Sequence, residues 1–138
     1  MTAKEYLRQY ENADKKVKRI RKEYEEEQLM IDAIKSATYF DGMPRSRMNG
    51  KNAILDKVVR LSEKQDKLKE AECEALEIRQ MVFDTVNGIS GDEGAVLYKR
   101  YISLKRWEEI AVEMNYSWSG IHKLHRRALH VVSDIIGA

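Results

Sequence analysis

The sequence predicts an all-α protein in which a long, coiled-coil-like antiparallel helical hairpin precedes a small three-helix helix-turn-helix domain. Three observations predict this class. The chain has 138 residues with one proline and few glycines, and strong helix formers such as Leu, Glu and Lys are frequent. Apolar residues recur at steps of three and four along two long stretches. After Gly88, two shorter amphipathic stretches meet at a tight turn. We therefore expect two domains, 1–88 with the long hairpin and 89–138 with the helix-turn-helix.

The first helix should begin at Thr2 and run to about Ser36. Thr2 and Glu5 have the spacing of a capping box, in which each side chain accepts a hydrogen bond from the other residue's backbone N–H. Beyond it, the apolar positions follow a heptad pattern that one polar residue, Glu27, interrupts. Those positions are Tyr6, Tyr10, Ala13, Val17, Ile20, Tyr24, Ile31 and Ile34. A helix so long and narrow is not stable alone in water, so we expect its stripe to pack against a partner.

The segment 37–50 should reverse the chain, because Gly42 and Gly50 favour turns and Pro44 cannot continue a helix. This loop also carries Arg45 and Arg47, whose role stays open between phosphate contact and solvated turn charge.

The second long helix should run from about Asn52 to Val86 and pack antiparallel to the first. Its apolar stripe consists of Ile54, Val58, Leu61, Leu68, Ala75 and Val82, widened by Leu55, Ile78 and Val86. The expected register places Ile34 near Ile54, Ile20 near Leu68, Tyr6 near Val82, and Glu27 near Gln65 in a shared polar layer. One partner helix cannot cover so wide a stripe, so further packing against the C-terminal unit or a second subunit is expected.

A third helix should follow a break at residues 87–94. Gly88 is suited to end the preceding helix in a left-handed conformation. Ser90 and Glu93 again have capping-box spacing, so we expect a helix from Ser90 to about Ile102. It should bury Val96, Leu97, Tyr101 and Ile102 and expose Lys99 and Arg100.

Residues 107–132 have the pattern of a helix-turn-helix. In its first helix, Ala111 is small enough to allow a close crossing, and Ile110 and Met114 face inward. Asn115 suits the left-handed turn and Ser117 the N-cap of the second helix. Tyr116 is expected to plug the turn, and the second helix should bury Ile121, Leu124, Ala128 and Val132.

The outer face of this second helix is the candidate binding surface. No acid interrupts the sequence between Glu113 and Asp134. A face that carries cations and hydrogen-bonding groups without carboxylates suits the phosphate-lined major groove of DNA. The same pattern also describes a solvated face in any all-α domain. The candidate residues are Trp118, Ser119, His122, Lys123 and Arg126.

The segments LYKRYI (97–102), WEEIAVEM (107–114) and LHRRAL (124–129) resemble the region-four domain of sigma-seventy factors, which reads the minus-thirty-five promoter element. The whole chain is similar to small phage and prophage proteins, the RinA-like and ArpU-like late transcriptional regulators, in which a MPRS-type turn (43–46) lies in the helical N-terminal half.

The resemblance implies a sequence-specific DNA-binding transcriptional regulator that acts with RNA polymerase. It implies base or phosphate contacts by the five candidate residues, and on that hypothesis His122, Ser119 and Lys123 discriminate bases while Lys123, Arg126 and Arg127 attract phosphates. Four further residues resemble the family's flanking backbone contacts in being basic: Lys99, Arg100, Lys105 and Arg106. The chain departs from the pattern at Asn115, where glycine is common, at Arg106, where a Ser or Thr cap is common, and at Trp118, which is bulky for a groove-facing position.

The expected partners are double-stranded DNA, RNA polymerase and further copies of the chain. A dimer is favoured because a single helix-turn-helix contacts few phosphates. Two alternatives stay open. A small DNA-packaging subunit also combines a helix-turn-helix with oligomerising helices, and a helical interaction module would dock on polymerase without reading DNA.

Other function classes find little support. The formal net charge of +2 does not by itself indicate binding to nucleic acid. No phosphate-binding glycine loop or nucleophile with a companion is present, so we expect no enzyme and no cofactor. The three histidines, His122, His125 and His130, lack nearby ligands and are expected to serve the surface rather than a metal. The single Cys73 fits a reducing compartment, and no apolar run could span a membrane, so a cytoplasmic location is expected.

Overall fold

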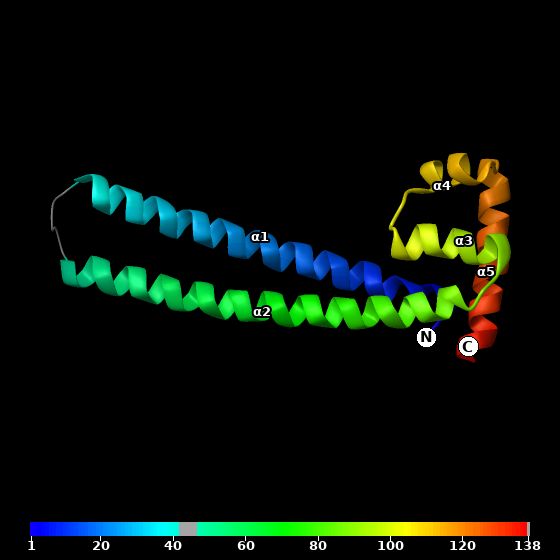
Figure 1. Cartoon of the computed structure of the whole chain (residues 1–138), viewed down its shortest axis with the longest axis horizontal. Coiled ribbons are helices and arrows are strands. Elements are labelled where there is room, and N and C mark those ends of the chain that lie inside the picture. The colour runs from blue at the N-terminus through cyan, green and yellow to red at the C-terminus, as the bar shows by residue number, and fades with distance from the viewer. Residues whose placement is uncertain (42–46, 138) are drawn as a thin grey trace. The chain divides into compact units, whose positions relative to one another are not determined.

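The computed structural model describes the backbone of residues 1–41 and 47–137, with side chains described for 1–37 and 53–137. Every element in these ranges is a helix, which confirms the all-α class (Figure 1). The elements are α1 (Ala3–Asp41), α2 (Arg47–Asn87), α3 (Gly91–Leu97), the π-helical turn η1 (Tyr98–Ile102), α4 (Trp107–Met114) and α5 (Trp118–Ile136). None of the helices in the described ranges has an apolar stretch sufficient to cross a lipid bilayer.

Helix α1 begins as the capping box predicts. The Thr2 backbone N–H donates to Glu5 Oε2 at 3.0 Å, and the Glu5 N–H donates to Thr2 Oγ1 at 3.2 Å. The helix ends at Asp41 rather than at Ser36, and α2 begins at Arg47 rather than at Asn52. Both helices are longer than expected because the segments between these positions contain no proline, and Gly50 is accommodated inside α2. The turn residues Gly42, Pro44 and Arg45 lie outside the described residues.

The described chain divides into two compact units, one formed by Met1–Asp14 with Glu74–Ala138 and the other by Lys15–Cys73. This division differs from the expected boundary between residues 88 and 89. The difference arises because both ends of the long helices contribute to one hydrophobic core with the C-terminal helices: Ala3 and Leu7 from α1, and Val82 and Val86 from α2. The N-terminal segment of α1 therefore belongs to the same compact unit as the helix-turn-helix.

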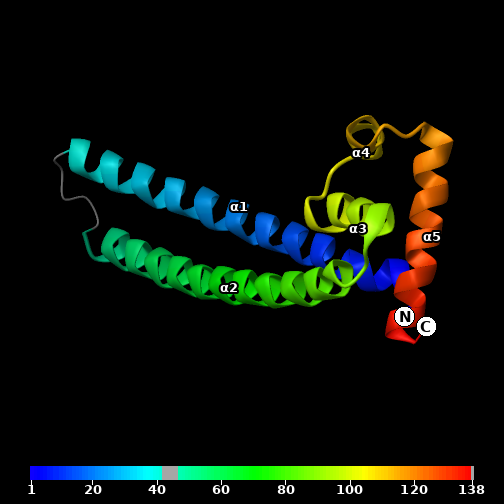
Figure 2. The same cartoon turned by 45° about the vertical axis from the view of Figure 1, so that its right-hand side comes forward.

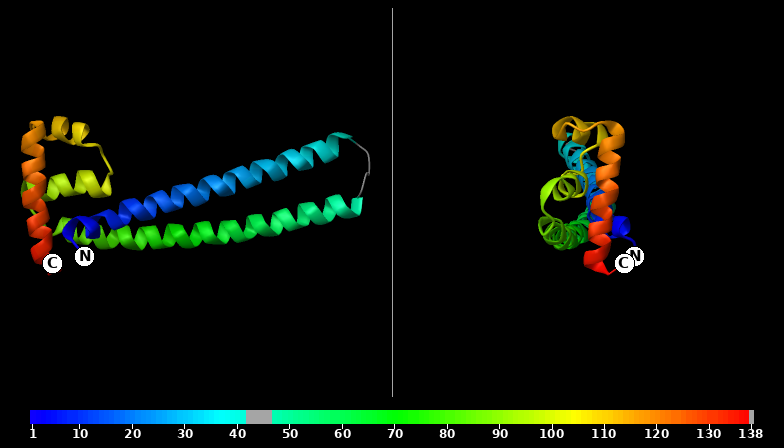
Figure 3. Two further views of the ribbon diagram at one scale, coloured as in Figure 1. Left: turned by 180° about the vertical axis from the view of Figure 1, so that it is seen from behind. Right: turned by 90° about the vertical axis from the view of Figure 1, so that its right-hand side faces the viewer.

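In the unit Lys15–Cys73, α1 and α2 run side by side in opposite directions, as Figure 2 and Figure 3 show. Val17, Ile31 and Ala71 are its buried apolar residues. Ion pairs join the helices: Arg21 Nη2 lies 2.8 Å from Glu72 Oε1, and Lys64 Nζ lies 3.1 Å from Glu27 Oε2.

The predicted stripe and register of α2 need two corrections in this unit. Glu27 pairs with Lys64, whereas Gln65, expected to share a polar layer with Glu27, is exposed. Leu55 and Val58 are also exposed, because a single partner helix covers only one face of α2.

The other unit contains the main core. Its fully buried side chains include Leu7, which the predicted stripe omitted. The Tyr6 hydroxyl lies 3.0 Å from Thr85 Oγ1, nearly one helical turn beyond Val82, where the heptad register placed it. The core of this unit consists of Ala3, Leu7, Val82, Val86, Val96, Leu97, Tyr101, Ile102, Ile110, Ala111, Ile121, Leu124, Ala128 and Val132.

The break between α2 and α3 differs from its predicted form in two ways. The Gly88 N–H donates to the Asp84 carbonyl at 3.3 Å, which continues the helical pattern, and the left-handed conformation falls instead on Gly91, with φ of 76°. Ser90 occupies the N-cap position with an extended backbone, but its side chain makes no capping hydrogen bond. The predicted extent to Ile102 is correct, although its last turn is π-helical and directs Tyr101 and Ile102 into the core.

Candidate nucleic-acid interface

The turn between α4 and α5 has the geometry that the sequence predicts. Asn115 adopts a left-handed conformation, with φ of 57° and ψ of 42°. The Tyr116 N–H donates to the Ala111 carbonyl at 2.9 Å, and the Asn115 N–H donates to that of Val112 at 3.3 Å. Ser117 caps α5, because its hydroxyl accepts a hydrogen bond from the Gly120 N–H at 3.0 Å. These bonds define the angle at which α5 leaves the turn.

Tyr116 fastens the turn to α3. Its ring packs partly buried against the core, and its hydroxyl donates to Asp92 Oδ2 at 2.6 Å. The hydrogen bond to Asp92 raises the pKa of Tyr116, with contributions from desolvation and from the Asp92 charge, whereas the Arg127 charge lowers it. The hydroxyl therefore stays protonated at neutral pH and keeps donating to Asp92.

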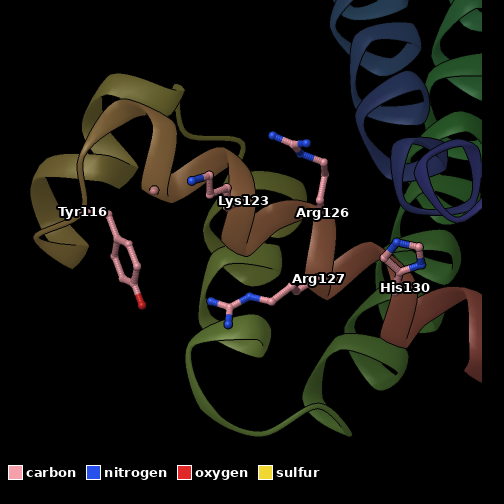
Figure 4. A pocket seen from close by; sticks show the side chains of 6 residues that line it. Tyr116, Lys123, Arg126, Arg127 and His130 are labelled. Carbon is pink, nitrogen blue, oxygen red and sulfur yellow. The ribbon is translucent and has the colours of Figure 1, made fainter.

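Helix α5 has one buried and one exposed face, since each residue turns the helix by about 100°. The buried face carries Ile121, Leu124, His125, Ala128 and Val132. Diametrically opposite is a set of exposed polar residues that we call the α5 outer face. It consists of Ser119, Lys123, Arg126, Arg127 and His130, and the exposed Asp134, about one turn beyond His130, is the first carboxylate on this side of the helix. Figure 4 shows the side chains of Lys123, Arg126 and Arg127 projecting from α5.

An open pocket of about 570 Å³ runs along this face. It is lined by Tyr116, Gly120, Lys123, Arg126, Arg127 and His130, none of which carries a carboxylate (Figure 4). Among the described residues, the ion pairs involve none of Lys123, Arg126 and Arg127. Positive charge on the α5 outer face is therefore available to an anionic ligand.

The other two candidates on α5 lie at the margin of the outer face. Trp118 is 56% exposed, and its ring centroid lies 4.7 Å from that of His122. His122 is half-buried, with Trp107 on its other side at 4.9 Å. The His122 ring is therefore packed against two tryptophan rings at the margin of the outer face.

His125 is buried, which corrects the expectation that all three histidines serve the surface. The buried stripe of α5 is wide enough to include it, and its ring lies 4.6 Å from that of Trp107. Its Nε2 lies 2.7 Å from the Tyr101 hydroxyl. Burial, reinforced by the nearby charges of Lys4, His122, Arg100 and Arg8, lowers the pKa of His125 to about 4. Burial likewise raises the pKa of Tyr101 to about 12, so a neutral imidazole and a protonated phenol share this hydrogen bond.

The four basic residues that precede α4 are engaged within the protein. Lys99 and Lys105 both lie 2.7 Å from the Glu113 carboxylate, and their hydrogen bonds lower the pKa of Glu113. Arg106 lies 3.4 Å from Glu109 in an exposed ion pair, and it holds the N-cap position of α4 without a side-chain cap.

Arg100 makes two contacts near the start of α4. It donates to the Lys105 carbonyl at 3.0 Å and stacks over Trp107, with its guanidinium carbon 4.9 Å from the ring centroid. These contacts and the ion pairs of Lys99, Lys105 and Arg106 occupy all four residues. The cations of the α5 outer face differ, since no ion pair within the described part of the chain involves them.

Three pocket residues were absent from the predicted site: Tyr116, Gly120 and His130. The signal that would have found them is their spacing. From Tyr116 through Gly120, Lys123 and Arg127 to His130, successive positions step by three or four, which places them along one side of α5. Within the described residues, His, Cys, Asp and Glu side chains form no group able to hold a metal ion.

Comparisons of the chain with protein-family models, with curated proteins and with solved structures returned no match.

Proposed function

We propose that this protein is a sequence-specific DNA-binding transcriptional regulator that uses α5 as its recognition helix. The observation that supports this best is the α5 outer face, which from Ser119 to His130 is exposed, cationic and free of carboxylates, on a helix whose start is held by the Ser117 cap. Such a face is what a major groove between two phosphate chains accepts.

The exposed residues divide by chemistry. Ser119 and Lys123, in the N-terminal half of α5, present hydrogen-bonding groups suited to base edges, and the half-buried ring of His122 lies beside them. Arg126 and Arg127 supply charge for phosphates. Trp118, exposed next to His122, offers an apolar surface to a sugar or to a partner protein. Lys99, Arg100, Lys105 and Arg106 have a smaller role in this proposal because each is already held by another group of the protein.

A single recognition helix contacts few phosphates, so a second subunit or RNA polymerase must add to the affinity. The resemblance to RinA-like and ArpU-like late regulators supports polymerase as that partner. The long hairpin is the assembly element in this proposal, with a dimer favoured. Exposed apolar residues on its two helices, including Leu29, Leu55 and Val59, support such a role.

The test is DNA binding by the purified full-length protein, first to a library that selects a preferred site and then to that site. Lys123→Ala and Arg126→Ala should each weaken binding to the selected site, by about 1 to 3 kcal/mol where a base contact is lost. Lys69→Ala is a matched control, since it removes an exposed lysine of α2 in the other compact unit. Failure to select any site, or equal affinity of all three variants, would contradict the proposal.

A helical interaction module is the second candidate, favoured by the same exposed apolar residues of the hairpin. It would bind polymerase without reading DNA. Polymerase binding that survives simultaneous replacement of Lys123, Arg126 and Arg127 by Ala, in a protein that selects no DNA site, would support it. The third candidate, a DNA-packaging subunit, would be distinguished by a ring-forming oligomer in sedimentation.

A further inference from the structure

We propose that the first turn of α1 supplies a second phosphate-binding element, in which Lys4 acts with Arg126 and His130 on the DNA backbone beside the recognition helix. This inference rests on the proposed function and deepens it, because it assigns a DNA contact to a part of the chain that the helix-turn-helix does not include.

The geometry brings these three residues to one place. A second pocket, of about 260 Å³, lies between the start of α1 and the C-terminal half of α5, within one compact unit. Arg126 and His130 line both this pocket and the larger one, so the two form a continuous cationic surface. The second pocket is lined by Thr2, Ala3, Lys4, Arg126, Leu129, His130 and Ser133, which include three basic residues, two hydroxyl groups and no carboxylate.

Lys4 is held at this surface by its neighbours in the chain. Ala3 and Leu7 are buried in the core that also contains Ala128 and Val132 of α5. The backbone of the first turn of α1 is therefore packed against α5, and the capping box of Thr2 and Glu5 orders it further. The Glu5 carboxylate accepts the Thr2 N–H and does not line the pocket.

The charge of Lys4 affects the buried His125 of α5. Burial is the main cause of the lowered pKa of His125, and Lys4 is the largest of the nearby charges that lower this pKa further. This agrees with a lysine lying close to α5.

The dimensions of the major groove indicate that Lys4, Arg126 and His130 would lie at the DNA phosphate backbone. From Ser119 to His130, α5 extends roughly 16 Å at 1.5 Å per residue. The major groove is about 12 Å wide, so a helix that presents Ser119 to the bases carries His130 to the groove's edge. There Lys4, Arg126 and His130 face phosphates rather than bases. Contacts of this kind set the position of a protein on the duplex and carry no sequence information directly.

The test compares Lys4→Gln with Lys22→Gln, which makes the same change on the same helix in the other compact unit. Both residues are exposed, so neither change should lower the melting temperature. Binding of the full-length protein to the selected site and to an unrelated duplex is measured over a range of salt. Lys4→Gln should weaken both complexes by the same factor and reduce the salt slope by about one, with base preference unchanged. His130→Gln should weaken both complexes in the same uniform manner.

Three outcomes decide the matter. A uniform loss for Lys4→Gln but not for Lys22→Gln supports the second element. Unchanged affinity and salt slope for Lys4→Gln, while Lys123→Ala and Arg126→Ala weaken binding, overturn this inference and leave the proposed function standing. A wild-type protein that binds neither duplex overturns both.

Discussion

At the scale of single residues, the pair of His125 and Tyr101 shows how a polar contact inside the core constrains the conditions under which the fold is stable. The 2.7 Å hydrogen bond joins a neutral imidazole and a protonated phenol inside the core. Protonation of His125 would place an unpaired charge among Tyr101, Trp107 and the apolar residues of α5.

We predict that the protein loses stability in mild acid because of His125. Its pKa falls from 6.5 to about 4 on folding, so the unfolded chain takes up a proton first as the pH drops. The contribution of His125 is thus fully present above pH 6.5 and is lost as the pH falls toward about 4. The measurement is the free energy of unfolding by urea between about pH 7.5 and about pH 4.5.

His125→Phe provides the control for this prediction. At neutral pH it should be less stable by about 1 to 3 kcal/mol, because the buried Tyr101 hydroxyl loses its partner. Between neutral pH and mild acid, however, its stability should fall less than that of the wild-type protein. Parallel curves for the two proteins would contradict the assigned role of His125.

At the scale of elements, α3 depends on the absence of a side chain at one position. Gly94 is buried, and a Cβ atom placed there would lie 2.0 Å from the Ile89 carbonyl oxygen. That oxygen belongs to the backbone of the α2–α3 connection and cannot move like the end of a flexible side chain. The close packing of α3 on this connection therefore requires glycine.

We predict that Gly94→Ala destabilises the protein by about 1 to 3 kcal/mol, because the backbone must shift to relieve the overlap. Gly88→Ala is the matched control: its φ is not positive, and the nearest atom to an added Cβ lies at 3.5 Å, an ordinary contact. Thermal unfolding followed by circular dichroism compares the two. Equal melting temperatures for both variants would show that α3 can move away from Ile89 without cost.

At the scale of the whole molecule, the helix-turn-helix shares its core with the ends of the long helices. Leu7 of α1 is fully buried there, together with Val82 and Val86 of α2. Residues at the start of the chain therefore stabilise the C-terminal helices, although most of the sequence separates the two segments.

We predict that Leu7→Ala costs about 2 to 5 kcal/mol and weakens DNA binding through loss of the folded unit. Leu29→Ala on the same helix is the control, since Leu29 is 68% exposed and should tolerate the change. Urea unfolding measures both variants. In the same experiment, a fragment of residues 89–138 should show no cooperative transition; a fragment as stable as the full chain would mean that the shared core is dispensable.

Features that depend on near neighbours in the chain could be predicted from the sequence. Thr2 and Glu5 predicted their capping box, Ser117 its N-cap and Asn115 its left-handed turn, because each is satisfied by backbone groups within a few residues. The apolar buried stripe of α5 was predictable as well, since helical periodicity alone defines it, whereas in α1 periodicity predicted Val17 and Ile31 but missed Ala3 and Leu7.

Contacts between residues far apart in the chain could not be predicted and follow from the tertiary packing. Periodicity defines a face but not its partner, so sequence reasoning missed the pairing of Glu27 with Lys64 and that of Lys99 and Lys105 with Glu113. The burial of His125 depends on the width of the core around α5, and the position of Lys4 beside Arg126 depends on the packing of α1 into that core. These contacts join residues far apart in sequence. Which residues come into contact depends on how the helices pack in three dimensions, and the local spacing of residues does not encode that packing.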